Sequence, residues 1–215
     1  MPAASEAAIS KSQEAVLRNA LDSLLVTFDG DLEARYRQHA HSRARDLISH
    51  SVYLLGLLYL VVVVPVMLLV DTAEMVAWRN YGVYPIAVAL VALWCSTRLS
   101  WLKPHTVLVL YLALGLALTG TLLGAIRFDG LFPGQISAFE TIYILIIGFS
   151  ILRLPPRQTL TSCLCALAAA LLVALLRQLP LPLLSMLLYF AIPLLICTLN
   201  GYILDISARR NFANN

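Results

Sequence analysis

The chain has 215 residues, of which 60% are hydrophobic and only 13% are charged, and its formal net charge is +3 at pH 7. Soluble domains carry about 25% charged residues, so this composition excludes an ordinary soluble domain. It also excludes disorder, which requires low hydrophobicity and high net charge. Long unbroken apolar runs exclude a porin-like barrel, and the absence of a basic cluster argues against a nucleic-acid partner. The composition therefore predicts an all-α, polytopic membrane protein.

The first 47 residues are predicted to form a cytoplasmic N-terminal region that begins with a disordered stretch. Ser10 and Gln13 fit a capping box before a short amphipathic helix over 13–28, which Gly30 should end. A second helix should start near Asp31 and run into the first span. Its polar part carries four arginines, Arg35, Arg37, Arg43 and Arg45. These arginines fit a topology signal that also binds anionic headgroups, or else a docking surface for a cytoplasmic module.

Six apolar stretches are long enough to cross a hydrocarbon core of about 30 Å, which requires about 20 helical residues. They are 48–70, 81–101, 105–126, 137–154, 158–176 and 183–204. The connections between them are short, so neighbouring helices should be antiparallel and form one six-helix domain over 48–204. Pro65 and Pro193 lie inside spans, where a proline is expected to kink the helix.

The basic residues predict how the bundle is oriented. Six spans place both termini on one side, and that side holds twelve basic residues while the opposite side holds three. The three are Arg79, Arg127 and Arg177. Because cytoplasmic loops carry the excess of Lys and Arg, both termini should be cytoplasmic, and we expect a multi-pass protein of a bacterial inner membrane.

Residues 205–215 leave the sixth span without a proline or glycine that would end the helix. A signalling helix that continues into a further domain is expected to behave in this way. The sequence is therefore interpreted as part of a longer protein whose output domain is absent from this chain.

The flanks of the spans carry the clearest motifs. A Phe-Glu-Tyr spacing precedes the first span, and an acidic residue, a basic pair and an aromatic residue follow the last one. These residues are Phe28, Glu33 and Tyr36 at the entry, and Asp205, Arg209, Arg210 and Phe212 at the exit. With six spans between them, the flanks resemble the N-terminal membrane sensor region of bacterial membrane-bound diguanylate (GGDEF-type) cyclases and related nucleotide cyclases.

The resemblance implies a sensory, anchoring and dimerising domain that regulates a C-terminal cyclase, which converts GTP to cyclic di-GMP, through the sixth helix. No GGDEF sequence or other catalytic motif occurs in these residues. No cofactor is expected in this chain, and GTP and Mg²⁺ are expected only for the missing domain. The implied partners are the lipid bilayer, a second copy of the chain, the output domain and an unknown small-molecule or lipid ligand. The residues predicted to transmit the signal are Asn200, Asp205, Arg209, Arg210 and Phe212.

Charged and aromatic residues gather on the side opposite the termini. The candidates for sensing are Glu140, Arg127, Arg177, Asp71, Trp78 and Tyr143. They fit either an aromatic belt with solvated loop charges or a shallow ligand pocket. A carboxylate at the start of a span needs a partner, so we hypothesise that Glu140 pairs with Arg127 or Arg177 and closes the outer mouth.

Several other polar and small residues have packing explanations. Asn200 is predicted to join two bundle helices or two protomers by a hydrogen bond, and Gly120 with Gly124 should allow close helix approach within one bundle. The cysteines are interpreted as packing residues rather than metal ligands. His50 and His105 could hold a haem only if they faced each other, and their positions fit interfacial histidines better.

A self-contained small membrane transporter or ligand-binding membrane protein is the alternative function. Ion-coupled transporters usually place a carboxylate in the middle of a span, and the predicted boundaries leave no Asp or Glu there.

Overall fold

A computed structural model describes residues 30–69, 72–152 and 154–213. Over these ranges the chain is helical apart from short connections and contains no strand. Six of the helices are long and apolar enough to cross a membrane, which confirms the predicted helical class and number of long apolar helices. The predicted amphipathic helix over 13–28 and the candidate residue Asp71 lie outside the described residues.

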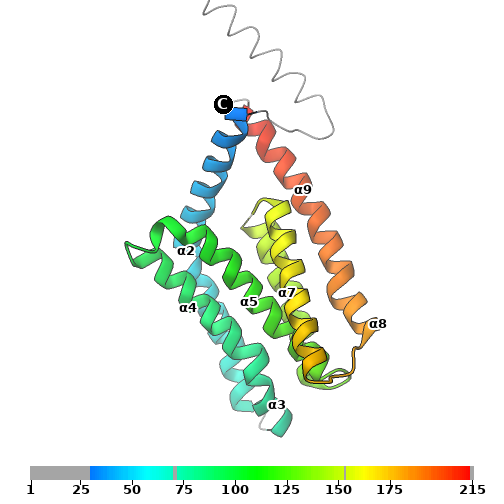
Figure 1. Cartoon of the computed structure of the whole chain (residues 1–215). Helices are drawn as coiled ribbons and strands as arrows, with labels where there is room; N and C mark the ends of the chain where they lie inside the picture. The colour runs from blue at the N-terminus through cyan, green and yellow to red at the C-terminus, as the bar shows by residue number, and fades with distance from the viewer. Residues whose placement is uncertain (1–29, 70–71, 153, 214–215) are drawn as a thin grey trace, which may run out of the picture.

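The elements follow one another as antiparallel helices joined by short turns (Figure 1). Here α denotes an α-helix, and η denotes a π-helical turn or, in η2, a 3₁₀ turn. In chain order they are α2 (Gly30–Leu69), α3 (Ala73–Trp78), η1 (Arg79–Val83), α4 (Tyr84–Arg98), η2 (Lys103–His105), α5 (Thr106–Arg127), α6 (Phe132–Ile146), η3 (Ile147–Ile151), α7 (Pro156–Leu176), α8 (Leu183–Met186), η4 (Leu187–Ala191) and α9 (Ile192–Ala213).

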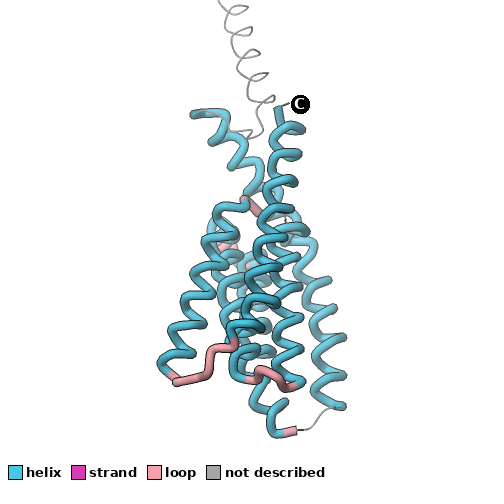
Figure 2. Tube along the Cα trace, turned by 90° about the vertical axis from the view of Figure 1, so that its right-hand side faces the viewer, coloured by secondary structure: helices cyan, strands magenta, loops and turns pink. Residues whose placement is uncertain are grey.

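Helix α5 lies at the centre of the bundle, where it packs against α4, α6 and α7. Its Leu118 is fully buried, in a cluster that also contains Leu145 of α6 and Phe149 of η3. Helices α2 and α9 lie at the periphery and extend beyond the other helices at one end of the bundle (Figures 1 and 2). We call this end the terminal end and the opposite one the far end.

The peripheral helices expose their large apolar side chains. On α2 the exposed residues include Leu54, Leu57, Leu58, Leu60 and Val61, and on α9 they include Leu195, Ile196, Leu199 and Ile203. Water-soluble monomers rarely expose contiguous apolar surface on this scale. The exposed apolar surface of α2 and α9 therefore agrees with the composition, which predicts a membrane protein.

Two of the three π-turns within the described residues occur just before a proline. The N–H of Tyr84 donates to the carbonyl of Arg79, and the N–H of Ile192 donates to the carbonyl of Leu187, each five residues back. The next residue is a proline in both cases, Pro85 and Pro193. A proline has no N–H to donate to the carbonyl four residues earlier, and its ring clashes with that carbonyl. A π-turn widens the helix locally and moves the carbonyl away from the ring. The predicted distortion at Pro193 thus takes the form of a π-turn, whereas Pro65 lies inside the continuous helix α2.

Two predicted connections are largely helical in the structure. The segment predicted as a loop over 71–80 contains α3, which starts where the Thr72 side chain accepts the N–H of Met75. The predicted loop over 127–136 ends early because α6 starts at Phe132, with Pro133 in its first turn. Polar residues in the first turns made both helices look shorter than they are. Glu140, which the sequence placed near the start of the fourth span, is therefore the ninth residue of the stretch Phe132–Ile151, about 12 Å from its start. The inference that no Asp or Glu lies in the middle of a span does not hold for this stretch.

The paired glycines of α5 pack within the bundle. A β-carbon on Gly120 would lie 2.5 Å from the ring of Pro85 and 2.6 Å from the carbonyl oxygen of Tyr81. A β-carbon on Gly124 would lie 2.4 Å from the hydroxyl of Ser137. Helix α5 therefore approaches the η1–α4 helix and α6 more closely than any larger residue would allow.

The Gly120 contact predicts a difference between two alanine substitutions on the same helix. We expect Gly120→Ala to destabilise the bundle by about 1–3 kcal/mol because the backbone of η1 must move. Gly115→Ala is the matched control, since its β-carbon would meet only the Ser162 hydroxyl at 3.5 Å. Thermal unfolding in detergent measures both, and equal midpoints for the two variants would contradict the packing described.

Candidate functional site

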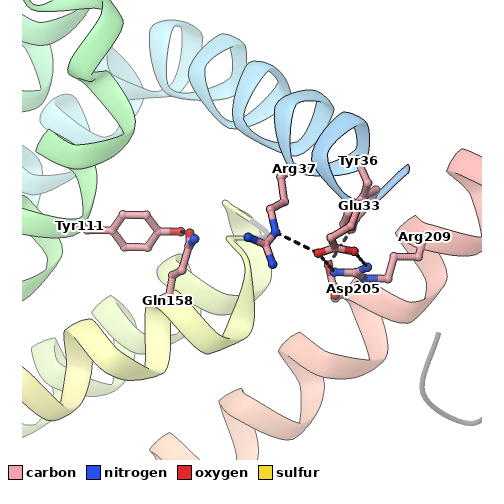
Figure 3. Close-up of polar contacts among 7 residues, drawn as sticks. All are labelled: Glu33, Tyr36, Arg37, Tyr111, Gln158, Asp205 and Arg209. Carbon is pink, nitrogen blue, oxygen red and sulfur yellow. Dashed lines mark hydrogen bonds and ion pairs between the residues drawn. The ribbon is translucent and has the colours of Figure 1, made fainter. Parts of the chain in front are cut away.

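Among the described residues, the most extensive polar contact between distant parts of the chain lies at the terminal end, where α2 meets α9 (Figure 3). The guanidinium of Arg209 donates to both carboxylate oxygens of Glu33, at 2.5 and 3.2 Å. The Tyr36 hydroxyl donates to Oδ1 of Asp205 at 2.6 Å. We call the set Glu33, Tyr36, Asp205, Arg209 and Phe212 the α2–α9 junction.

Helical spacing explains how each helix presents its half of the junction. Residues three or four apart share a helix face, so Glu33 and Tyr36 face one way, and Asp205, Arg209 and Phe212 form a second stripe. Asp205 accepts a hydrogen bond from Nε of Arg209 at 2.8 Å within α9. Glu33 likewise accepts one from Nε of Arg37 at 3.0 Å within α2. These intrahelical pairs orient the charged groups before the helices meet.

The junction combines charge pairing with aromatic packing. The Arg209 guanidinium lies 4.4 Å from the centre of the Tyr36 ring, and the Phe212 ring meets the same tyrosine edge-on at 5.6 Å. Tyr36 is only 4% exposed. Arg209 and Glu33 side chains are 15% and 20% exposed, so their charge-assisted hydrogen bonds are partly shielded from water. Helices α2 and α9 diverge towards the far end (Figure 1). The junction is therefore formed mainly by long side chains and lies outside the core of the bundle.

Protonation of Glu33 should loosen the junction only in acid. Glu33 lies in the polar first turn of α2, ahead of the apolar stretch that starts near residue 48, and the hydrogen bond from Arg209 lowers the pKa of its carboxyl below the ordinary value of 4.5. A group with a lowered pKa stabilises the packed state above its ordinary value and loses this contribution as the pH falls through the lowered one.

We therefore expect wild type to be better protected than Glu33→Gln in the last turns of α9 at neutral pH. The difference should be complete above the ordinary pKa of 4.5 and should shrink as the pH falls below it and through the lowered pKa of Glu33. Hydrogen exchange over residues 205–213, corrected for the intrinsic rate at each pH, measures it. A difference that does not shrink as the pH falls below 4.5 would show that the Glu33 charge does not hold the junction.

The remaining residues predicted to transmit the signal or to form the basic helix have different surroundings. Arg210 is exposed and forms no ion pair within the described residues, in contrast to Arg209. Asn200 donates from Nδ2 to the Ser150 hydroxyl at 2.9 Å, so it joins two helices of one bundle. Among the basic residues of α2, Arg35 and Arg45 are exposed, and Arg43 is partly buried near Tyr36.

The predicted ion pair of Glu140 is wrong. Within the described residues, Glu140 has no ion pair with Arg127 or Arg177, and its buried Oε2 atom has no hydrogen-bond partner. The Arg127 guanidinium instead lies 5.7 and 5.8 Å from the ring centres of Tyr81 and Phe128. The physical reason is depth: α6 starts earlier than predicted, which carries Glu140 below the level of the arginines at the far end.

The other sensing candidates do not gather into one pocket. Trp78 is 1% exposed and donates from Nε1 to the Ser137 hydroxyl at 2.8 Å, which makes it a core residue. Tyr143 is 64% exposed on the outside of α6, and Arg177 is exposed where α7 ends. The structure thus separates these residues instead of forming the predicted pocket from them.

A cavity does exist at the far end, but none of the described sensing candidates lines it. It has a volume of about 220 Å³ and lies between α5, α6 and the segment α8–η4. Polar groups in its lining include Asp129, Gln135 and Ser185. No periodicity or spacing linked these residues, because they come from three separate segments. Among the described residues, no group of three or more His, Cys, Asp or Glu is placed to hold a metal ion.

Comparison of the chain with protein-family models, with curated proteins and with solved structures found no match.

Proposed function

We propose that this chain is the membrane-embedded sensory, anchoring and dimerising domain of a bacterial signalling protein, and that it regulates a C-terminal cytoplasmic diguanylate cyclase through α9. The observation that carries the proposal is the α2–α9 junction. The entry and exit motifs that resemble those of membrane-bound cyclases are 169–176 residues apart in sequence, yet they contact each other directly.

The membrane placement is supported by the surface of the bundle. Its peripheral helices expose large aliphatic side chains over lengths sufficient for about 30 Å of hydrocarbon. The described part of the terminal end carries most of the basic residues, which fits a cytoplasmic location. In this orientation the junction lies at the inner surface, and the cavity faces the periplasm.

The junction suits a regulatory role because it is a small contact outside the core. Elements with few buried apolar contacts open at lower free energy than the core does. A stimulus that favours one packing of the bundle can release α9 from α2 or hold it there, provided that it binds the two packings with different affinities. Rotation or sliding of α9 in a homodimer would then change how two cyclase domains meet.

A cyclase assay on the complete protein tests this function. Diguanylate cyclase activity is compared between the protein with these spans and a version in which an unrelated helical membrane anchor replaces residues 1–204. We expect cyclic di-GMP production to differ between the two, since the domain sets the position of the exit helix. Equal production would reduce the domain to a tether, and a downstream sequence that encodes no cyclase would reject the proposal outright.

The buried carboxyl of Glu140 favours a second candidate, a small membrane transporter. Ionisable groups inside a span commonly mark ion pathways or proton relays, and this one has an oxygen without a partner among the described residues. If the chain is a transporter, the wild-type protein should show proton flux in proteoliposomes that contain a pH-sensitive dye, and Glu140→Gln should abolish this flux. If the chain is a sensory domain, neither the wild-type protein nor Glu140→Gln should show proton flux.

A further inference from the structure

The cavity at the far end has a polar side and an apolar side. Apolar walls come from Leu122 and Ile126 of α5 and from Phe190 of η4, while Asp129 and Ser185 contribute polar groups. The Ser185 hydroxyl donates to Oδ1 of Asp129 at 2.6 Å, which links the turn after α5 to α8. Pockets that bind small molecules are usually apolar, with a few polar groups that fix the orientation of the ligand.

The carboxylate of Asp129 gives the cavity its charge preference. No ion pair to Asp129 exists among the described residues. The nearest arginine in sequence, Arg127, has its guanidinium over the rings of Tyr81 and Phe128. The side-chain amide of Gln135 and the hydroxyl oxygen of Ser185 add hydrogen-bond acceptors to the same lining. A negative group with neighbouring acceptors suits a ligand that carries a donor-rich cation.

The volume limits the size of that ligand. An apolar cavity of about 150 Å³ accommodates benzene, so a cavity of about 220 Å³ has room for one ring and a short polar chain. We propose that this cavity binds a small primary amine with a compact apolar body, whose ammonium group is held by Asp129 and whose body lies against Phe190 and the α5 side chains.

The position of η4 links this site to the junction. Phe190 belongs to the π-turn that continues directly into α9, and α9 carries Asp205 and Arg209 at its other end. A π-turn contains one residue more than an α-turn, so a ligand that favours one form over the other would rotate or slide α9. The inference of a binding site depends only on the cavity and its lining, whereas the role of this site as the sensory input rests on the proposed function.

Calorimetry on the purified chain in lipid nanodiscs tests the site, with 2-phenylethylamine as the probe. We expect saturable binding after subtraction of empty nanodiscs, and at least tenfold weaker binding of the neutral analogue 2-phenylethanol and of the anion phenylacetate. Asp129→Asn should weaken amine binding at least tenfold. Asp46→Asn, which changes an exposed carboxylate at the terminal end, should leave it unchanged. If Asp129→Asn fails to fold, Ser185→Ala provides a milder change that should weaken binding several-fold.

Three results would overturn the site. They are no saturable amine binding by the wild-type chain, equal binding of the amine and the alcohol, and undiminished binding by the folded variants, which would place the amine elsewhere. Failure of the proposed function has a different signature. If the amine binds through Asp129 but leaves the output activity of the complete protein unchanged, the site remains and its sensory role is rejected. Regulated output without amine binding would reject the site alone.

Discussion

Arg209→Ala is expected to release the last turns of α9 from α2. The substitution removes the group that bonds both Glu33 and Asp205 and that covers the Tyr36 ring. Hydrogen bonds to charged groups contribute about 1.5–3 kcal/mol each, so the local opening equilibrium should rise at least tenfold. Hydrogen exchange resolved by mass spectrometry should show this acceleration over residues 205–213 and over the first turns of α2, while α5 keeps its protection.

The neighbouring arginine provides the matched control. Arg210→Ala removes the same charge and nearly the same volume one position further along α9, where the side chain is exposed. It should leave exchange at the junction unchanged. If both variants accelerate exchange equally, the effect comes from net charge or helix propensity, and the junction does not hold α9. If the complete protein carries the proposed cyclase, only Arg209→Ala should alter its production of cyclic di-GMP.

Trp78→Ala is expected to be the most destabilising single substitution in the far half of the bundle. The indole is 1% exposed, and its Nε1 donates to Ser137. Truncation of a buried tryptophan leaves a large cavity and costs about 3–5 kcal/mol in protein cores. It also leaves the buried Ser137 hydroxyl without its donor. The free energy of unfolding in mixed micelles, measured by denaturing-detergent titration and circular dichroism, should fall by this amount.

Two further variants separate cavity formation from loss of the hydrogen bond. Trp78→Phe keeps a ring but loses the indole N–H, so its effect should lie between those of wild type and Trp78→Ala. Trp101→Ala removes a tryptophan that is 69% exposed and should change the free energy of unfolding by less than about 1 kcal/mol. Equal losses for Trp78→Ala and Trp101→Ala would contradict the packing of Trp78.

The helical class and the six long apolar helices could be predicted from the sequence because lipid-facing helices need about 20 apolar residues each. Helix ends were harder to predict. The stretch with Glu74 and Arg79 looked like a loop by polarity, yet Thr72 caps a helix there. The π-turns before Pro85 and Pro193 could not be anticipated either, since a proline inside a span predicts a distortion without specifying its form.

The candidate site was predictable only in part, for a similar reason. The spacings of Glu33 with Arg37 and of Asp205 with Arg209 indicate helix faces, and the resemblance singled out both flanks. Pairing between the flanks depends on the three-dimensional arrangement of the bundle, which no local spacing encodes. The far-end candidates were chosen by charge and aromaticity. This criterion placed Asp129 on the outer face but missed Ser185, whose hydrogen bond to Asp129 joins the turn after α5 to α8 across 56 residues.

The central claim is that a bundle in the membrane brings both of its flanks to the cytoplasmic surface, where α2 and α9 meet. Single cysteines at Gln38, Ser207 and Asn80, introduced into a cysteine-free background, test it with a membrane-impermeant maleimide on intact cells with a permeabilised outer membrane. We expect rapid labelling at Asn80, and labelling at Gln38 and Ser207 only after the inner membrane is opened. Labelling of Gln38 and Ser207 from opposite sides would contradict the topology, the junction and the proposed control of a cytoplasmic cyclase together.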